Sequence, residues 1–398
     1  MKILFLTNFY PKVDNKNSGI FVVKRLFEYK NLGIDFDVIP IYMKDDVILS
    51  LARKILKLSS TEAIEEFYNI NFKIVNVKIN LFKKILEKIG VVNFSKEFFK
   101  YLEKELDLNS YDIVYAHGMS LNIPAGFIAK IIFEKYKIPY IVTLHGGDVN
   151  YNMAKFGKKN LYIQTFEKAS KVVFVSDALL ERAKSYGYSG RNAAVIPNGY
   201  DPTIFKPMDK VFIRKELNIY KEGYKYVGFV GNLIPVKRAD KLPEIFEKIA
   251  KRYKRVKFLI VGDGYLREKI EEKMKQKNLN YIFTERVLQE DVARYMNAMD
   301  VMVLPSRNEG WPCVVLEAQA CGTCVIGSSN GGIPEAIGFE EYVVKDGENF
   351  EERFAKKVVE ILSNGYESDK FIQRVKNYTW ENIVKKEISV LENFRKDE

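Results

Sequence analysis

Short apolar runs alternate with amphipathic helical patterns along almost the whole chain. Apolar runs bounded by glycine, proline or polar residues predict buried parallel strands, and the segments between them predict helices that cover the sheet. The strands predicted in the first half are residues 2–9, 36–42, 72–79, 112–118, 139–146, 171–176 and 193–198. Those predicted in the second half are residues 226–231, 256–264, 281–285, 300–306, 323–329 and 341–347. The pattern therefore predicts an α/β fold with two parallel sheets.

One break separates the two series of strands. Residues 198–202 end a strand, and a less regular stretch follows as far as Tyr224. We therefore predict a first Rossmann-like domain over residues 1–206 and a second over residues 207–378. Residues 379–398 have a helical pattern and are predicted to form a final helix.

The composition of the 398 residues is typical of a globular protein large enough for two cores, with 47% hydrophobic and 29% charged residues. No apolar segment approaches the ~20 residues that span a bilayer, and the first residues, MKILFLTNFYP, lack the cleavage pattern of a signal peptide. The three cysteines form no disulfide framework, which is typical of a reducing compartment. We therefore expect a cytoplasmic protein.

The net charge of +11 indicates an anionic partner, whether nucleic acid, an anionic membrane face or a phosphorylated substrate. Many lysines lie in two helical patterns, at residues 51–60 and 81–90, beside apolar stripes. The stripes are Leu51, Ile55 and Leu58 in the first pattern, and Phe82, Ile85, Leu86 and Ile89 in the second. Two interpretations are open: either both helices pack on their own domain, or their basic faces contact anionic lipid at the inner face of the cell membrane.

Two carboxylates surround the start of a predicted helix in the second half. Glu309 lies in the turn after an apolar strand, and Glu317 lies one to two turns inside the helix, for which Pro312 suits the first position and Gly322 the residue after the last turn. Ligands of open α/β sheets bind at the carboxyl ends of strands, and helix amino termini favour phosphate. Carboxylates beside a phosphate site are electrostatically unfavourable, because both groups are negatively charged, unless the carboxylates bind hydroxyls. The arrangement therefore predicts a nucleotide-sugar site.

The pattern E-x7-E from Glu309, followed by A-C-G-T, a buried strand and G-G-I-P-E, resembles the carboxyl-terminal half of the family-4 retaining glycosyltransferases, such as those that build bacterial and archaeal cell-surface polysaccharides. The resemblance extends along the chain, through residues 145–148 (HGGD), 175–177 (VSD), 196–201 (IPNGYD), 230–233 (VGNL) and 261–264 (VGDG). It implies the GT-B fold, with two Rossmann-like βαβ domains facing across a cleft and a final helix that crosses back onto the first domain. It implies transfer of a hexose from a nucleotide diphosphate, with UDP-sugar favoured and GDP-mannose as an alternative, to a lipid-linked or cell-surface saccharide.

The resemblance also assigns roles to residues of the second domain. Glu317 is expected to bind the ribose hydroxyls, Glu309 hydroxyls of the donor sugar, and Lys237 the diphosphate, where it stabilises the leaving group. The N–H groups of residues 310–314 are expected to face sugar and phosphate, and the loop after residues 281–285 to offer main-chain contacts to the base. The substrate-binding residues of these segments are Gly310, Cys313, Val314, Arg286 and Val287.

Two positions depart from the family pattern. Asn232 stands where the family usually has an arginine, and Arg238 stands where it usually has a glycine. Either Arg238 supplies the absent guanidinium, or Asn232 donates a weaker neutral hydrogen bond to phosphate. A solvated surface role for Arg238 is the remaining interpretation.

In the first domain, His117 and His145 are the only histidines, and both follow predicted strands. The resemblance implies that His145 faces the donor sugar and that the main chain at Gly19 approaches the pyrophosphate. Asp148 is expected to orient the loop after His145, to contact sugar, or to cap the following helix.

Other motifs are assigned to structure. Cys321 and Cys324 have the spacing of a redox dithiol, but Cys321 lies at a helix carboxyl end, where the dipole does not lower a thiol pKa, so we predict packing roles. Asp35 and Asp37 match the D-x-D metal motif of another glycosyltransferase fold, but they precede a strand, on the edge opposite the ligand site. We therefore expect no metal and no other cofactor, with the phosphate charge balanced by Lys237 and helix amino termini.

Three other functions share some of these features. A sugar-nucleotide epimerase shares the GT-B fold and would act without an acceptor. A glycosidase would use Glu309 and Glu317 as acid and nucleophile, but would not need Lys237. A nucleic-acid-binding protein would use the positive charge, but the chain lacks a basic-aromatic recognition module, so no nucleic acid is expected as a partner.

Overall fold

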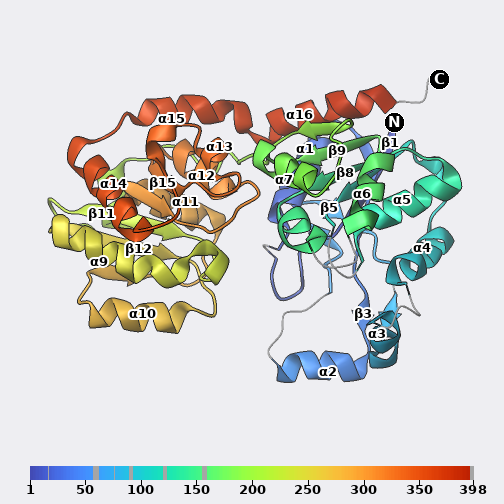
Figure 1. Ribbon diagram of the computed structural model, residues 1–398, viewed down its shortest axis with the longest axis horizontal. Coiled ribbons are helices and arrows are strands. Elements are labelled where there is room, and N and C mark those ends of the chain that lie inside the picture. The colour runs from blue at the N-terminus through green and yellow to red at the C-terminus, as the bar shows by residue number, and fades with distance from the viewer. Residues whose placement is uncertain are drawn as a thin grey trace. The chain divides into compact units, whose positions relative to one another are not determined.

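The computed structural model describes residues 1–16, 18–56, 62–75, 77–88, 93–119, 123–154 and 159–394. Its contacts divide the chain into two compact units (Figure 1). The first unit consists of Met1–Pro197 and the carboxyl-terminal segment from Trp380, and the second consists of Asn198–Thr379.

This division differs from the boundary that we predicted between residues 206 and 207. The N–H of Tyr200 donates to the carbonyl of Tyr378 at 3.0 Å, and Nδ2 of Asn297 donates to the carbonyl of Lys206 at 3.0 Å. The residues just before 207 are therefore tied to the second unit by hydrogen bonds.

The first unit is built on a six-stranded parallel sheet in the order β10-β9-β8-β7-β1-β2. Its strands are β1 (Lys2–Thr7), β2 (Asp35–Pro40), β7 (Ile113–His117), β8 (Tyr140–Leu144), β9 (Lys171–Phe174) and β10 (Ala193–Val195). Its helices are α1 (Ile20–Asn31), α2 (Val47–Ile55), α3 (Leu81–Lys88), α4 (Phe94–Glu105), α5 (Ala125–Tyr136), α6 (Lys159–Lys168), α7 (Asp177–Ser185) and α16 (Trp380–Leu391). The strand order reverses between β1 and β7, which makes the carboxyl ends of these strands a potential ligand site.

The strand predicted at residues 72–79 does not join this sheet. In residues 72–79, β6 (Lys78–Ile79) pairs with β3 (Lys44–Asp45), and Phe72 makes a single bridge to Val38 in β2. Pro40 in β2 has no N–H to donate, so a regular ladder cannot extend along this edge of β2. A second pair of short strands, β4 (Glu66–Phe67) and β5 (Ile70–Asn71), forms a hairpin.

The two basic segments form α2 and α3. No residue of α2 is buried, so the interpretation that α2 packs its apolar face on its own domain is wrong. Lys57, Leu58 and Ile89, and the side chains of residues 85–88, lie outside what the structure describes.

The final helix, α16, packs against α1. Arg25 Nε of α1 lies 3.0 Å from Glu387 Oε1 of α16, and both side chains are buried. Tyr29 OH donates to the other carboxylate oxygen of Glu387 at 3.2 Å. A buried ion pair of this kind fixes the position of α16 on the first unit.

The second unit repeats the architecture with a parallel sheet in the order β13-β12-β11-β14-β15-β16. Its strands are β11 (Lys225–Val230), β12 (Val256–Val261), β13 (Tyr281–Phe283), β14 (Val301–Leu304), β15 (Cys324–Ser328) and β16 (Val343–Val344). Its helices are α8 (Lys210–Glu216), α9 (Leu242–Arg252), α10 (Arg267–Gln276), α11 (Gln289–Ala298), α12 (Cys313–Ala320), α13 (Ile333–Ile337), α14 (Phe350–Asn364) and α15 (Ser368–Val375). The two sheets confirm the predicted α/β fold with two Rossmann-like domains. In this sheet the strand order reverses between β11 and β14.

Candidate active site

Two loops at the carboxyl edge of the second sheet bring Lys237 and Glu309 together. Lys237 ends a short turn (Pro235–Lys237) after β11, and Glu309 lies in the loop after β14. These neighbouring strands flank the reversal of strand order, where ligands bind in open α/β sheets. Lys237 Nζ donates to Glu309 Oε1 at 2.6 Å, and the two side chains are 23% and 12% exposed. The predicted phosphate-binding cation and sugar-binding carboxylate therefore form one ion pair.

Arg307 fastens the two loops to each other. Its N–H donates to the carbonyl of Val236 at 2.8 Å, and its guanidinium donates to both carboxylate oxygens of Asp240 at 3.0 and 3.2 Å. A bidentate pair constrains direction as well as distance. Sequence reasoning missed both residues, because nothing in their local pattern distinguishes them from surface charges.

The loop after β15 supports Glu309 from its main-chain side. The N–H of Gly332 donates to the carbonyl of Glu309 at 3.0 Å. Gly331 has a φ of +56°, and a Cβ at this position would lie 2.2 Å from that same carbonyl oxygen. Only glycine permits this approach without displacing Glu309. The signal was present in the G-G-I-P-E motif, but the motif alone does not show what the glycine touches.

Helix α12 begins one residue later than predicted. Pro312 is its N-cap residue, with ψ of 96°, rather than its first helical residue, and Gly322 follows the last turn with φ of +74°, as predicted. Cys313 and Val314 are the first residues of the helix, and the N-cap residue Pro312 contributes no side-chain hydrogen bond to this terminus. Gly310 is buried in the loop before α12. The amino terminus of α12 thus follows directly on the Glu309 loop.

Glu317 lies in the second turn of α12 and is half-buried. Its carboxylate accepts no hydrogen bond from the described residues. Burial, together with the negative charge of Asp201, raises the pKa of Glu317 to about 7. A carboxylate held at this cost, without a protein partner, is available for hydroxyl groups of a ligand.

Arg238 is buried, so its solvated surface role is excluded. Its Nη2 lies 3.0 and 2.8 Å from the two carboxylate oxygens of Asp346, and its guanidinium lies 4.1 Å from the centre of the Phe350 ring. Asn330 also donates to Asp346, and these contacts hold the pKa of Asp346 well below its usual range. Asn232, in contrast, is exposed after β11.

The loops after β12 and β13 complete this edge of the sheet. Cβ atoms added at Gly262 and Gly264 would lie 2.3 and 2.5 Å from carbonyl oxygens of the loop after β11, so both glycines permit direct backbone packing. Beyond β13, Arg286 is exposed and Val287 is half-buried. All predicted residues of the second unit therefore lie in loops, or in the first turns of helices, that follow the carboxyl ends of strands.

The first unit places His145 after β8 and His117 at the end of β7. Their rings stack at a centroid distance of 5.8 Å, and Phe9 and Phe21 contact the His145 ring at 5.0 and 4.7 Å. Burial lowers the pKa of both histidines well below the usual value, and the charge of Arg25 adds to the effect. Both imidazoles are therefore neutral at pH 7, and their buried ring nitrogens have no hydrogen-bond partner among the described residues.

Asp148 orients the loop that carries His145. One carboxylate oxygen accepts the N–H of His145 at 2.8 Å and the other accepts the N–H of Met119 at 2.5 Å. Asp148 is buried, and burial raises its pKa although these N–H groups oppose the shift. Of the three interpretations, the loop-orienting one fits this geometry.

Gly19 is the N-cap residue of α1, with φ of +68°. A Cβ there would lie 2.4 Å from the nitrogen of Tyr10 and 2.5 Å from the carbonyl carbon of Phe9. Gly19 therefore packs on the loop after β1, and the ring of Phe9 from that loop contacts His145. The structure brings Gly19 and His145 to the same edge of the first sheet.

The motifs assigned to structure have ordinary partners. Cys321 and Cys324 are buried, and burial raises the pKa of both thiols, that of Cys324 to about 12. Asp37 lies 2.8 Å from Lys73 Nζ and accepts the hydroxyl of Tyr111 at 2.6 Å, at the start of β2. These groups are not at the carboxyl edge of either sheet.

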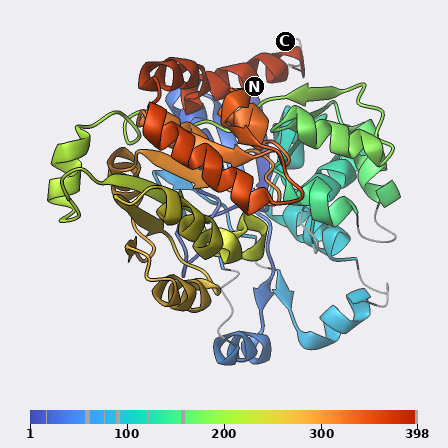
Figure 2. The same ribbon diagram turned by 60° about the vertical axis from the view of Figure 1, so that its left-hand side comes forward.

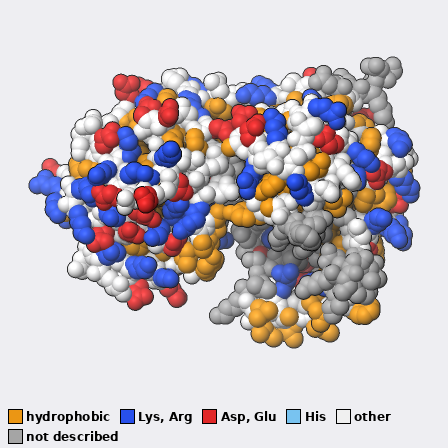
Figure 3. All heavy atoms as spheres, viewed as in Figure 1, with side chains coloured by type: hydrophobic (Ala, Val, Ile, Leu, Met, Phe, Trp, Pro, Cys, Tyr) orange, Lys and Arg blue, Asp and Glu red, His pale blue; other side chains and the backbone are white. Residues whose placement is uncertain are grey.

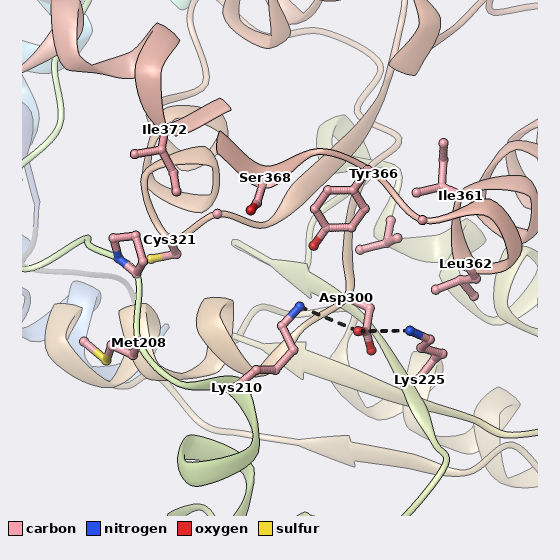
Figure 4. A pocket seen from close by; sticks show the side chains of 14 residues that line it. Met208, Lys210, Lys225, Asp300, Cys321, Ile361, Leu362, Tyr366, Ser368 and Ile372 are labelled. Atoms are coloured by element: carbon pink, nitrogen blue, oxygen red, sulfur yellow. Dashed lines mark ion pairs between the residues drawn. The ribbon is translucent and has the colours of Figure 1, made fainter. Parts of the chain in front are cut away.

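A separate pocket of about 400 Å³ lies at the opposite, amino-terminal edge of the second sheet (Figure 4). Lys210 and Lys225 approach the same oxygen of Asp300 at 3.6 and 3.8 Å, and Arg214 pairs with its other oxygen at 2.7 Å. These three cations offset the negative charge of Asp300 at this edge of the sheet. The pocket contains none of the residues predicted for the ligand site.

Comparison with known proteins identifies the class. Residues 209–378 match the family model of glycosyl transferases group 1, and residues 71–204 match that of glycosyltransferase family 4. Together with the two Rossmann-like domains, these matches define a glycosyltransferase of the GT-B fold. The chain belongs to the family-4 glycosyltransferases.

Several relatives illustrate this membership. The putative teichuronic acid biosynthesis glycosyltransferase TuaC of Bacillus subtilis is 28% identical over 86% of this chain and 85% of its own length. N-acetyl-alpha-D-glucosaminyl L-malate synthase of Bacillus anthracis is 31% identical over 57% of this chain and 58% of its own. Among solved structures, Anabaena HepE in complex with UDP has a TM-score of 0.74 at 17% identity, over 99% of this chain and 100% of that one. In the described residues, no helix is long and apolar enough to cross a membrane.

Proposed function

We propose that the protein transfers a hexose from a nucleotide diphosphate sugar to a saccharide acceptor, with retention of configuration at the anomeric carbon. The observation that carries the proposal is the ion pair between Lys237 and Glu309 at the reversal of strand order in the second sheet. The diphosphate of a nucleotide sugar needs a cation. The attached sugar needs a hydrogen-bond acceptor within a few ångströms of that cation. The pair supplies both.

The donor is bound by the second unit in this proposal. Lys237 contacts the diphosphate and stabilises the charge that develops on the leaving group. The hexose and phosphate are contacted by Glu309 and by the N–H groups of Gly310, Cys313 and Val314. These groups lie in the loop before α12 and in its first turn. Glu317 binds the ribose hydroxyls.

Four further residues complete the donor site. Arg286 and Val287 offer main-chain groups to the base. Asn232 is the exposed candidate for a neutral hydrogen bond to phosphate. Arg238 supports the loop after β11 that carries Lys237, because Asp346 already occupies its Nη2 group.

The first unit contributes Gly19 and His145. The neutral imidazole of His145 has unpartnered ring nitrogens, so it can donate a hydrogen bond to a sugar hydroxyl without adding charge. Asp148 fixes the main chain at His145, whose carbonyl is proposed to support the anomeric carbon. Gly19 offers its main chain to the pyrophosphate at the amino terminus of α1.

Retention is proposed to proceed by attack on the face from which the diphosphate leaves. A phosphate oxygen of the leaving group takes the proton of the acceptor hydroxyl as the bond to the anomeric carbon breaks. Glu309 is the carboxylate nearest this chemistry, and its pairing with Lys237 suits a binding role rather than that of a nucleophile. The reaction is proposed to need no metal, since Lys237 and the helix termini offset the phosphate charge.

UDP-sugar is the favoured donor and GDP-mannose the alternative. Solved structures of HepE and of Staphylococcus aureus TarM contain UDP, whereas a relative from Corynebacterium glutamicum is named as GDP-mannose-dependent. The acceptor is proposed to be a lipid-linked or cell-surface saccharide, in line with the name of TuaC. A sugar-nucleotide epimerase is the second candidate, favoured only by the shared fold.

The test is product analysis with candidate nucleotide sugars, each incubated with and without saccharide acceptors. The proposal predicts release of nucleoside diphosphate that is stimulated by an acceptor, and a product whose anomeric proton shows the configuration of the donor. An inverted product would overturn retention. Release of an epimer with no acceptor present would favour the epimerase.

A further inference from the structure

Large apolar side chains are concentrated on two short helices of the first unit. Among the described residues, 18 large hydrophobic side chains are exposed, and seven of them lie within residues 47–56 and 81–82. They are Val47, Ile48, Leu51, Ile55, Leu56, Leu81 and Phe82. Figure 3 shows hydrophobic side chains gathered over α2. We call these seven residues the apolar tip. The other exposed hydrophobic residues are spread over the described chain.

The apolar face of α2 is exposed, whereas a helix that packs on the core of its own domain buries this face. Val47, Leu51 and Ile55 recur every four residues and form one face, and they are 85%, 58% and 72% exposed. Leu49 and Arg53, on the other face, are the less exposed residues of the helix. The apolar face of this amphipathic helix therefore points to solvent, and α2 lies at the outer end of its unit in both views (Figure 1, Figure 2).

This orientation is fixed by ion pairs on the inner side. Arg53 of α2 and Lys84 of α3 both pair with Asp45 of β3, the latter at 3.3 Å. Lys83 of α3 pairs with Glu97 of α4. Both helices are thus attached through charged residues. The described apolar residues that stay exposed are Val47, Ile48, Leu51 and Ile55 of α2 and Leu81 and Phe82 of α3. The exposure of the apolar tip is a consequence of how the segment is built.

The charge and composition of the apolar tip select among its potential occupants. α2 contains Arg53 and Lys54 and no acidic residue, and α3 contains three lysines and one glutamate. Lys54 is exposed at the margin of the apolar face and has no ion pair among the described residues. Protein interfaces are enriched in tyrosine, tryptophan and arginine at their centres, whereas this face is aliphatic apart from Phe82. Aliphatic residues bordered by cations are typical of helices that lie in a membrane interface.

We propose that the apolar tip inserts into the surface of a lipid bilayer that contains anionic lipid, with α2 lying in the plane of the interface. Leu51, Ile55 and their neighbours enter the boundary between headgroups and acyl chains. Lys54 contacts anionic headgroups at the margin. The apolar tip shares no residue with the proposed donor site, and the proposal holds whatever sugar the enzyme transfers.

The experiment is flotation of the full-length protein with vesicles of phosphatidylcholine, with or without phosphatidylglycerol. The test variant is Leu51→Gln with Ile55→Gln, which removes two exposed side chains and no buried contact. The matched control is Val211→Gln with Phe212→Gln on α8, where two exposed apolar residues also lie on a short helix. Lys54→Gln tests the contribution of charge. Circular dichroism and binding of a nucleoside diphosphate show that each variant is folded.

We expect the wild type and the α8 control to float with the anionic vesicles, and the α2 variant to bind at least about tenfold more weakly. Lys54→Gln should weaken binding to the anionic vesicles and leave any binding to pure phosphatidylcholine unchanged. Absence of flotation in the wild type, or equal flotation of the α2 variant, would overturn the proposal. Light scattering that shows a dimer dissolved by the α2 substitutions, without vesicle binding, would assign the apolar tip to a second copy of the chain instead. Nucleotide binding reports on the donor site separately, so failure of one proposal does not imply failure of the other.

Discussion

Lys237 Nζ lies 2.6 Å from Glu309 Oε1, although 72 positions separate the two residues in the sequence. Each lies on a different loop, and Arg307 and Asp240 hold those loops together. The cation is thus positioned before any ligand arrives, and a bound diphosphate must share it with Glu309. This preorganisation is what an electrostatic stabiliser of a leaving group requires.

Replacing Lys237 with alanine should lower turnover far more than donor affinity, because charge on the leaving phosphate grows as the glycosidic bond breaks. We expect kcat to fall by about 10²–10³ and the donor Kd to change little. Steady-state kinetics and calorimetry on the folded variant provide the measurement. Lys241→Ala is the control, since Lys241 pairs with Glu244 and Glu351 one turn further along. Near-normal kcat in Lys237→Ala would place the phosphates elsewhere.

Gly331→Ala should reduce activity by displacing Glu309, because the added Cβ would lie 2.2 Å from its carbonyl oxygen. We expect kcat/KM to fall at least about tenfold. In addition, the strain of an alanine at a positive φ should lower the free energy of unfolding by roughly 1–2 kcal/mol. Gly33→Ala is the matched control, with a φ of +72° and no atom within 4 Å of the added Cβ. If both variants lose stability equally and neither loses activity, the loop after β15 does not position Glu309.

Glu317→Gln should make stability less dependent on pH. The carboxyl is protonated in both states below its ordinary pKa of 4.5, and between 4.5 and about 7 the unfolded chain releases the proton while the folded protein keeps it. Stability contributed by this group therefore falls as pH rises through that window, by roughly 2–3 kcal/mol in total. The glutamine variant should unfold at a higher temperature than the wild type near pH 8, with little difference near pH 5. Equal shifts in melting temperature at both pH values would contradict the raised pKa of Glu317.

Glu387→Ala should strongly destabilise the first unit, since it leaves the buried guanidinium of Arg25 without its carboxylate. We expect a loss of about 3–5 kcal/mol in the free energy of unfolding. Lys385→Ala, which removes the exposed pair with Glu381 on the same helix, should change it by less than about 1 kcal/mol. Thermal denaturation of the two variants compares these cases, and a small effect of Glu387→Ala would mean that α16 is held by apolar packing alone.

Activity should persist in excess EDTA, because the proposed charge stabilisers are protein groups. Donor turnover before and after chelation gives the measurement. A loss of turnover that manganese restores would show that a divalent cation takes part in the reaction.

Local patterns were sufficient to predict the strands of both sheets and the segments that carry Lys237, Glu309 and His145, because strand periodicity and loop motifs are short-range features. Residues 72–79, also predicted as a strand, do not join the first sheet. They did not show what these residues contact. The partner of Arg238 is Asp346, 108 positions away, and this distant contact decided between a surface position and burial. The orientation of α2 was likewise unpredictable, because amphipathicity identifies an apolar face without showing whether a domain covers it. Long-range packing supplied both answers.

Calorimetric titration of UDP, GDP and ADP into the wild type and into Glu317→Ala tests whether the second unit holds a nucleotide-sugar site. We expect one nucleoside diphosphate to bind the wild type, and the folded variant to bind it more weakly by about 1–3 kcal/mol, through loss of charge-assisted hydrogen bonds to ribose. Lack of binding by all three nucleotides, or equal affinity in the variant, would contradict the placement of a nucleotide-sugar site at the carboxyl edge of the second sheet.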